Sequence, residues 1–92
     1  MEENWEKIFR TIKYPIELSF NQFFIEIKSL KNINETFVFL TYEDYDDDSE
    51  CNIDFDDTYH CEKVSDSKYE FKGFFVLNDT FTSESITIES ID

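Results

Sequence analysis

The chain has 92 residues, of which 40% are hydrophobic and 18% aromatic, and a formal net charge of -14. This length predicts one domain, residues 1–92, and the aromatic content argues against a disordered acidic chain. The charge argues against binding to nucleic acid or to an anionic membrane, because both would repel the protein.

Residues 2–13 are predicted to form a helix. Their large apolar side chains recur at the spacing i, i+3, i+4 and i+7 and make one stripe: Trp5, Ile8, Phe9 and Ile12. Pro15 disfavours the helical conformation for the residue before it, so the helix should end there.

Residues 19–31 fit two different structures. Helical spacing is matched by the apolar residues Phe20, Phe23, Phe24, Ile27 and Leu30, and Ser19 with Gln22 has the form of a capping box. The alternative is a strand over "FFIEI", residues 23–27, in which apolar side chains alternate. We favour the helix.

From residue 36 onward the apolar pattern has a period of two, which predicts strands. The segment "TFVFLTY", residues 36–42, is apolar on both faces, as expected of a central strand covered on both sides. Further strands are predicted over 51–56, 68–77 and 84–90, with a bulge at Gly73. The expected fold is α+β, with N-terminal helical segments packed on an antiparallel sheet of four or five strands.

The sequence offers little for catalysis. His60 is the only histidine, and its neighbour Cys61 would point to the opposite face of a strand. A chain with one glycine cannot build a glycine-rich phosphate loop. We therefore expect a protein that is not an enzyme and has no cofactor.

A metal site is not expected either. Asp46, Asp48 and Glu50 alternate like the first ligands of a calcium loop, but the sixth and twelfth positions lack the required glycine and glutamate. Cys51, His60 and Cys61 would leave a zinc ion without its fourth ligand. The chain shows neither an apolar span nor a signal-peptide core, so we expect a cytoplasmic protein with reduced thiols, and a Cys51–Cys61 disulfide stays open.

Residues 42–57, "YEDYDDDSECNIDFDD", hold nine carboxylates and no lysine or arginine. Tyrosines lie among and beside them, and tyrosine is common at the centres of protein interfaces. An acidic rim with aromatic anchors suits a basic protein groove. The candidate partner-binding residues are Tyr42, Glu43, Asp44, Tyr45, Asp46, Asp47, Asp48, Glu50, Asp54, Asp56, Asp57 and Tyr59.

In size, charge and acidic–aromatic surface, the chain resembles two groups of small acidic inhibitors. One group comprises immunity proteins of bacterial nuclease toxins, and the other comprises phage nucleic-acid mimics such as anti-CRISPR and anti-restriction proteins. The resemblance implies a protein that blocks the basic groove of a nuclease, with toxin immunity as the first reading and phage counter-defence as the alternative. A small adaptor with a solubilising acidic loop is a further alternative, and the oligomeric state stays open.

Overall fold

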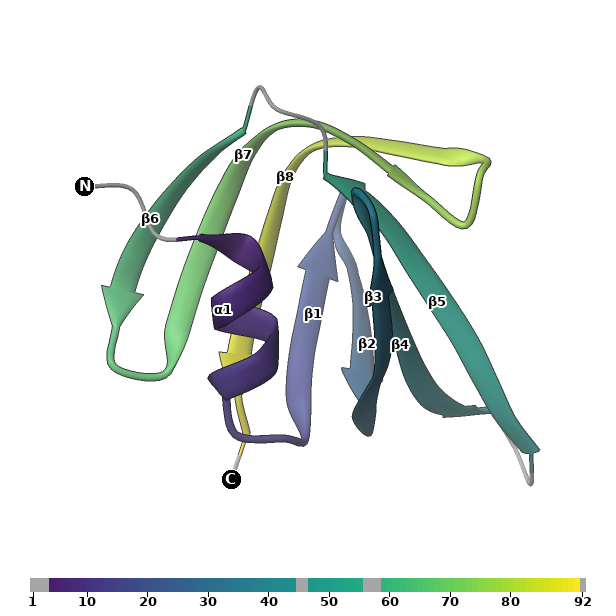
Figure 1. The fold of residues 1–92 in the computed structure, drawn as a ribbon. Helices are drawn as coiled ribbons and strands as arrows, with labels where there is room; N and C mark the ends of the chain where they lie inside the picture. Colours follow the sequence, from purple (N-terminus) through teal and green to yellow (C-terminus); the bar gives the residue numbers. More distant parts are fainter. Residues whose placement is uncertain (1–3, 45–46, 56–58, 92) are drawn as a thin grey trace.

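Residues 4–44, 47–55 and 59–91, which the computed structural model describes, form one helix and eight strands (Figure 1). The helix is α1 (Trp5–Thr11). The strands are β1 (Ile16–Phe20), β2 (Phe23–Ile27), β3 (Ser29–Asn34), β4 (Phe37–Asp44), β5 (Asp47–Phe55), β6 (His60–Ser65), β7 (Lys68–Leu77) and β8 (Phe81–Ser90).

All eight strands belong to one antiparallel sheet that curls around the core. The strand order is β2-β1-β8-β7-β5-β4-β3, and β6 pairs with β7. The two ends of this order, β2 and β3, are adjacent in sequence and are separated by Lys28 alone. The Lys28 backbone N–H donates to the carbonyl oxygen of Thr41 on β4, at 2.8 Å. The bent segment β2–β3 therefore brings the two ends of the sheet together into a small barrel, although no strand pairing joins β2 to β4 among the described residues.

The expected α+β fold is wrong, because strands make up 70% of the structure. The favoured helix over residues 19–31 is instead the end of β1, all of β2 and the start of β3. Asn21 and Gln22 both have positive φ angles, 49° and 77°, as the two central residues of a tight hairpin turn do. This turn lets "IELSF" and "FFIEI" pair as strands, and their closely spaced apolar residues only imitate helical spacing.

The later strands follow the predicted pattern more closely. β7 has the predicted bounds, and the register of its pairing with β8 shifts between Lys72 and Phe75, around Gly73, which confirms the bulge. β4 lies between β3 and β5 as predicted, but only one of its faces is covered. Val38 and Leu40 are fully buried, whereas Phe37 and Phe39 are half-buried on the outer face.

The helix α1 lies against the concave side of the curled sheet (Figure 1). It is shorter than predicted: the side chain of Asn4 caps its start by accepting a hydrogen bond from the Glu6 backbone, and Ile12 is already extended. The predicted apolar stripe does face the core, where Trp5, Ile8 and Phe9 are buried.

Phe55 lies at the centre of the core. Its ring stacks on Trp5 at a centroid distance of 4.8 Å, and the rings of Phe9, Phe71 and Phe75 meet it edge to face at 5.1–5.6 Å. The last residue of β5 thus ties the acidic hairpin to the helix. No helix in the described part of the chain is long and apolar enough to cross a membrane.

Candidate protein-binding surface

The β4–β5 hairpin carries the predicted acidic residues and extends away from the rest of the barrel (Figure 1). Successive side chains of each strand point to opposite faces of this hairpin. Cys51 and Ile53 on β5 are buried, so the side chains that alternate with them face outward. The described carboxylates that share this outer face are Glu43, Asp48, Glu50 and Asp54.

The fold brings lysines to this face that the acidic segment itself lacks. Lys28, at the bend between β2 and β3, lies 3.1 Å from Asp48, and Lys31 on β3 pairs with Glu50. All four side chains are more than a third exposed, so these ion pairs add little stability. Asp54 accepts a hydrogen bond from the Thr36 hydroxyl at 2.7 Å. Part of the predicted acidic surface is therefore already paired within the chain.

The two predicted tyrosines that the structure describes do not lie on this face. Tyr42 points to the inner side of β4, where it is half-buried and lines two cavities. Tyr59 packs edge to face on Phe55, and its hydroxyl oxygen accepts a hydrogen bond from the Trp5 backbone at 3.3 Å. Tyr59 thus serves the core, and the prediction that it anchors a partner is not supported by its position.

Four of the predicted residues lie outside the described part of the chain: Tyr45, Asp46, Asp56 and Asp57. For Asp44 and Asp47, only the backbone is described, and they pair with each other at the end of the hairpin.

A second row of carboxylates crosses the barrel on β2, β1 and β8. Glu17 is directly opposite Glu26 on one side and Glu89 on the other. All three alternate with buried isoleucine or leucine residues and therefore face outward. Sequence analysis did not single out these glutamates, although each follows a buried or half-buried isoleucine in an alternating segment. Their alignment depends on strand register, which the sequence does not show.

Five carboxylates from these two groups form a surface that we call the acidic belt. Glu26 and Glu43 line the same cavity, of about 500 Å³, from opposite sides, and Glu43 is opposite Asp48. The acidic belt, in order across the barrel, consists of Glu89, Glu17, Glu26, Glu43 and Asp48.

The acidic belt places like charges side by side. Like charges directly opposite each other destabilise a sheet, by roughly 0.2–1 kcal/mol a pair. Among these residues Glu89 is opposite Lys68, and Asp48 is paired with Lys28, whereas Glu17, Glu26 and Glu43 have no ion pair within the described part of the chain. The acidic belt therefore carries an electrostatic cost in the free protein.

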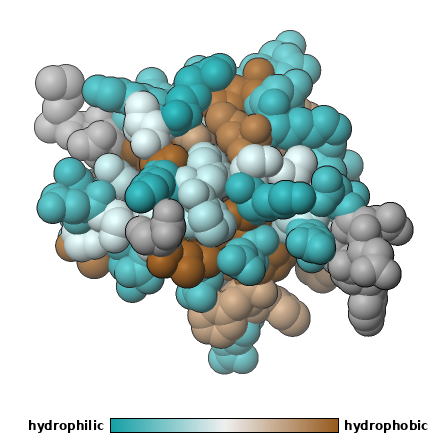
Figure 2. Space-filling view, turned by 90° about the horizontal axis from the view of Figure 1, so that it is seen from below, coloured by the Kyte–Doolittle hydropathy of each residue, from teal (hydrophilic) through white to brown (hydrophobic). Residues whose placement is uncertain are grey.

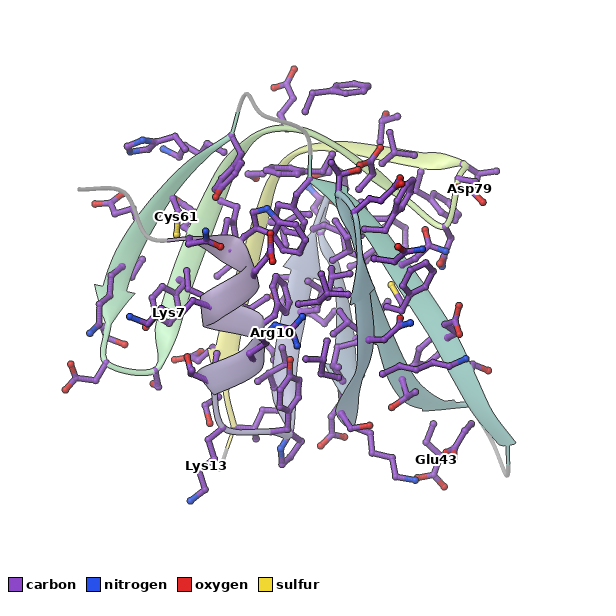
Figure 3. All side chains as sticks on the ribbon, viewed as in Figure 1. Lys7, Arg10, Lys13, Glu43, Cys61 and Asp79 are labelled. Atoms are coloured by element: carbon purple, nitrogen blue, oxygen red, sulfur yellow. The ribbon has the colours of Figure 1, made fainter. Side chains whose placement is uncertain are left out.

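Other basic residues lie on a different side of the molecule. Figure 3 shows Lys7, Arg10 and Lys13 on and just after α1, while Glu43 lies at the far end of the β4–β5 hairpin. The bases of the helix therefore lie away from the end of the acidic hairpin.

The outer face of β4 also carries an aromatic pair that sequence analysis missed. The rings of Phe37 and Phe39 stack with their centroids 6.2 Å apart, and Phe37 is directly opposite Asp54. Neither ring is fully buried. The phenylalanines of "TFVFLTY" alternate with the buried residues and so share one face, but the segment is predicted from the sequence as a strand covered on both faces.

The described residues contain no cluster that could form a metal centre. No group of three or more histidine, cysteine or acidic side chains among them could hold a metal ion. Cys51 and Cys61 are both buried and are not joined in a disulfide. Burial raises the pKa of the Cys51 thiol to about 11, which makes it a poor nucleophile at neutral pH.

Comparisons with known proteins give no match to a family model, to a curated protein or to a solved structure.

Proposed function

We propose that the chain is a non-catalytic inhibitor that binds the basic substrate groove of a nuclease through the acidic belt and the outer face of the β4–β5 hairpin. The observation that carries the proposal is the acidic belt, in which Glu89, Glu17 and Glu26 are in register on three strands and, across the adjoining cavity, Glu43 is opposite Asp48. Repulsion between these neighbouring carboxylates destabilises the fold, and a cationic partner would relieve that repulsion.

The geometry of the surface supports a nucleic-acid-binding target. Side chains two apart on a strand are about 6.6–6.8 Å apart, and neighbouring strands lie about 4.7–4.9 Å apart. On the outer face of β5, Asp48 and Glu50 lie two residues apart and Asp54 follows after the uncharged Asn52, so the strand presents repeated negative charge along one line. Lysine and arginine side chains that bind phosphates can pair with carboxylates placed in this way.

The proposal has two versions. In the first, the chain is the immunity protein of one bacterial nuclease toxin and binds that toxin alone. In the second, it is a phage-encoded mimic that competes with DNA or RNA for a CRISPR or restriction nuclease. The repeated negative charge favours competition with nucleic acid, which both versions allow but only the second requires.

The test uses two variants of equal net charge. The belt variant combines Glu17→Gln, Glu26→Gln and Glu43→Gln. The control variant combines Glu6→Gln, Asp66→Asn and Glu84→Gln, which are exposed and have no carboxylate opposite them in the described strand register. Binding and inhibition are measured against purified cationic nucleases that include toxin domains and CRISPR or restriction nucleases, with and without competing DNA.

The belt variant should lose affinity tenfold or more, because truncating one member of a buried charge pair costs roughly 2–5 kcal/mol. The control variant should bind like the native chain, and binding should weaken as salt is raised. Equal affinity for the two variants would contradict the proposal, as would a failure to bind any cationic nuclease.

A further inference from the structure

An apolar groove lies between β2 and β4, next to the acidic belt. Among the described residues, β2 pairs along one edge only, with β1, while β4 pairs with β3 and β5. Beyond the hydrogen bond from Lys28 to Thr41, no strand pairing joins β2 to β4 among the described residues. Ile25 and Tyr42 lie in the gap and line both of the cavities that it contains.

The first cavity of the groove is apolar. Its volume is about 230 Å³, and it is lined by aromatic and aliphatic side chains of β1, β2, β4, β7 and β8 together with Asn78. Phe23 and Phe81, on its walls, are 60% and 55% exposed. Pockets for drug-sized ligands measure about 300–1,000 Å³, so this cavity suits one large side chain better than a free metabolite.

The second cavity of the groove is charged. Glu26 and Glu43 line it together with Phe24, which is 70% exposed. Lys28 lies there too, but its ammonium group pairs with Asp48. The two glutamates have no ion pair among the described residues, so this end of the groove favours a cation.

The end of the barrel seen from below has the same mixed character. Figure 2 shows small apolar areas there, separated and surrounded by hydrophilic side chains. Such an arrangement of apolar contact within a polar rim is typical of protein interfaces.

We infer that the groove binds an extended segment of the basic partner and supplies the apolar part of the contact. An aliphatic or aromatic side chain of that segment enters the cavity between Phe23, Tyr42 and Phe81. A neighbouring lysine or arginine lies between Glu26 and Glu43. A second copy of this chain does not fit the charge, since each copy carries -14. The inference rests on the proposed function, because the partner's basic character comes from there.

The probe is a synthetic eleven-residue peptide of lysine, arginine and serine with one central leucine. The matched peptide has serine in place of the leucine. Affinities are measured by fluorescence anisotropy, and the contacts are mapped by amide chemical-shift changes. The native chain should bind the leucine peptide about tenfold more tightly or better, because burying one leucine adds that much binding energy.

Two variants locate the effect. Phe23→Ser combined with Phe81→Ser should abolish the preference for leucine. Phe74→Ser is the control, because Phe74 is 55% exposed but lines a different cavity, with Asn21 and Ser83. All these phenylalanines are largely exposed, so the variants should stay folded, and the amide spectra verify this.

The outcomes separate the two claims. Equal affinity for both peptides, or a preference that survives in the double variant, would overturn the groove inference. If both peptides bind equally and the belt variant weakens both, the basic-partner proposal stands and the groove inference fails. If neither peptide binds, both fail.

Discussion

The side chains of this protein fall into two groups, an aromatic core and a charged outer surface. Phe55 shows the connection, since it ends the acidic strand β5 and at the same time contacts Trp5, Phe9, Phe71 and Phe75. Burial of several aromatic rings in one cluster supplies stability that offsets charge repulsion elsewhere. Phe55 therefore anchors β5 in the core and, with it, positions the outward-facing carboxylates of that strand.

Phe55→Ala should destabilise the fold by about 3–5 kcal/mol, because it removes a ring at the centre of the aromatic cluster and leaves a cavity. The free energy of unfolding is measured by urea denaturation. Phe24→Ala is the matched control, since Phe24 is 70% exposed, and its effect should stay within about 0.5 kcal/mol. Similar losses in the two variants would contradict the central role of Phe55.

Cys51 should react slowly in the folded protein. With a pKa raised from 9.0 to about 11, its thiolate population at pH 8 is about a hundredfold smaller than that of an ordinary cysteine. Alkylation by iodoacetamide, followed at Cys51 by peptide mass spectrometry, should therefore be slow at pH 8 and become fast in 8 M urea. Equal rates in the two conditions would show that the thiol is neither buried nor shifted.

The same pKa shift makes stability depend on alkaline pH. The folded state favours the protonated thiol, so its contribution is complete below the unfolded pKa near 9 and is lost as pH rises toward 11. Cys51→Ala should reduce this loss between pH 9 and 11. The measurement is the urea midpoint as a function of pH, and an unchanged slope in the variant would contradict the assignment.

At the scale of strands, register creates a surface that no single segment contains. Glu17, Glu26 and Glu89 come from three strands and meet only because β1 pairs with β2 on one side and with β8 on the other. The alternation in each segment predicts that these residues face outward. The pairing that aligns them depends on contacts distant in sequence, which composition and spacing do not show.

Glu17→Gln should stabilise the protein by about 0.2–1 kcal/mol, because it removes repulsion with a glutamate on each side. The gain should shrink as salt is raised from 0.01 to 1 M, since screening weakens the same repulsion. Glu84→Gln is the control: Glu84 is exposed on β8 and has no partner in the described strand register. Equal gains for the two variants in urea denaturation would show that net charge, rather than alignment, is responsible.

The elements that sequence analysis predicted well are those with a clear period and an unambiguous turn. Residues 68–77 alternate around Gly73 and form β7 with the predicted bounds. The helix predicted over residues 19–31 is wrong because the turn within it, Asn21-Gln22, lacks the glycine that usually marks a tight hairpin. The side chain of Asn21 donates to the Thr82 carbonyl at 2.7 Å, so contact with β8 fixes the turn. That contact is invisible in the local pattern.

The candidate surface was predicted only in part, again because contacts between distant segments are not visible in the local sequence pattern. Residues 42–57 did identify the acidic hairpin, and Glu43, Asp48, Glu50 and Asp54 do share its outer face. Its lysine partners come from β2–β3 and its aromatic neighbours from the outer face of β4. Sequence proximity pointed to the tyrosines, whereas the strand alternation places Phe37 and Phe39 on that face.

The whole molecule carries a net charge of -14 on a barrel whose Cα radius of gyration is 12.1 Å. Self-repulsion at this density destabilises the compact state. The bases on and after α1 lie away from the β4–β5 hairpin, so they do not cancel its charge (Figure 3). The stability of the free protein should therefore be sensitive to ionic strength.

Raising NaCl from 0.01 to 0.5 M should increase the melting temperature of the free chain by several degrees. The Debye length falls from about 30 Å to below 10 Å over this range, so repulsion across the barrel is largely screened. For a chain of this size, about 1 kcal/mol of added stability corresponds to about 4–8 °C. The belt variant should show a smaller increase than the control variant of equal net charge, because its aligned charges have been removed. A melting temperature that stays constant or falls with salt would mean that repulsion within the acidic belt does not oppose folding. The physical reason for expecting a cationic partner would then be lost.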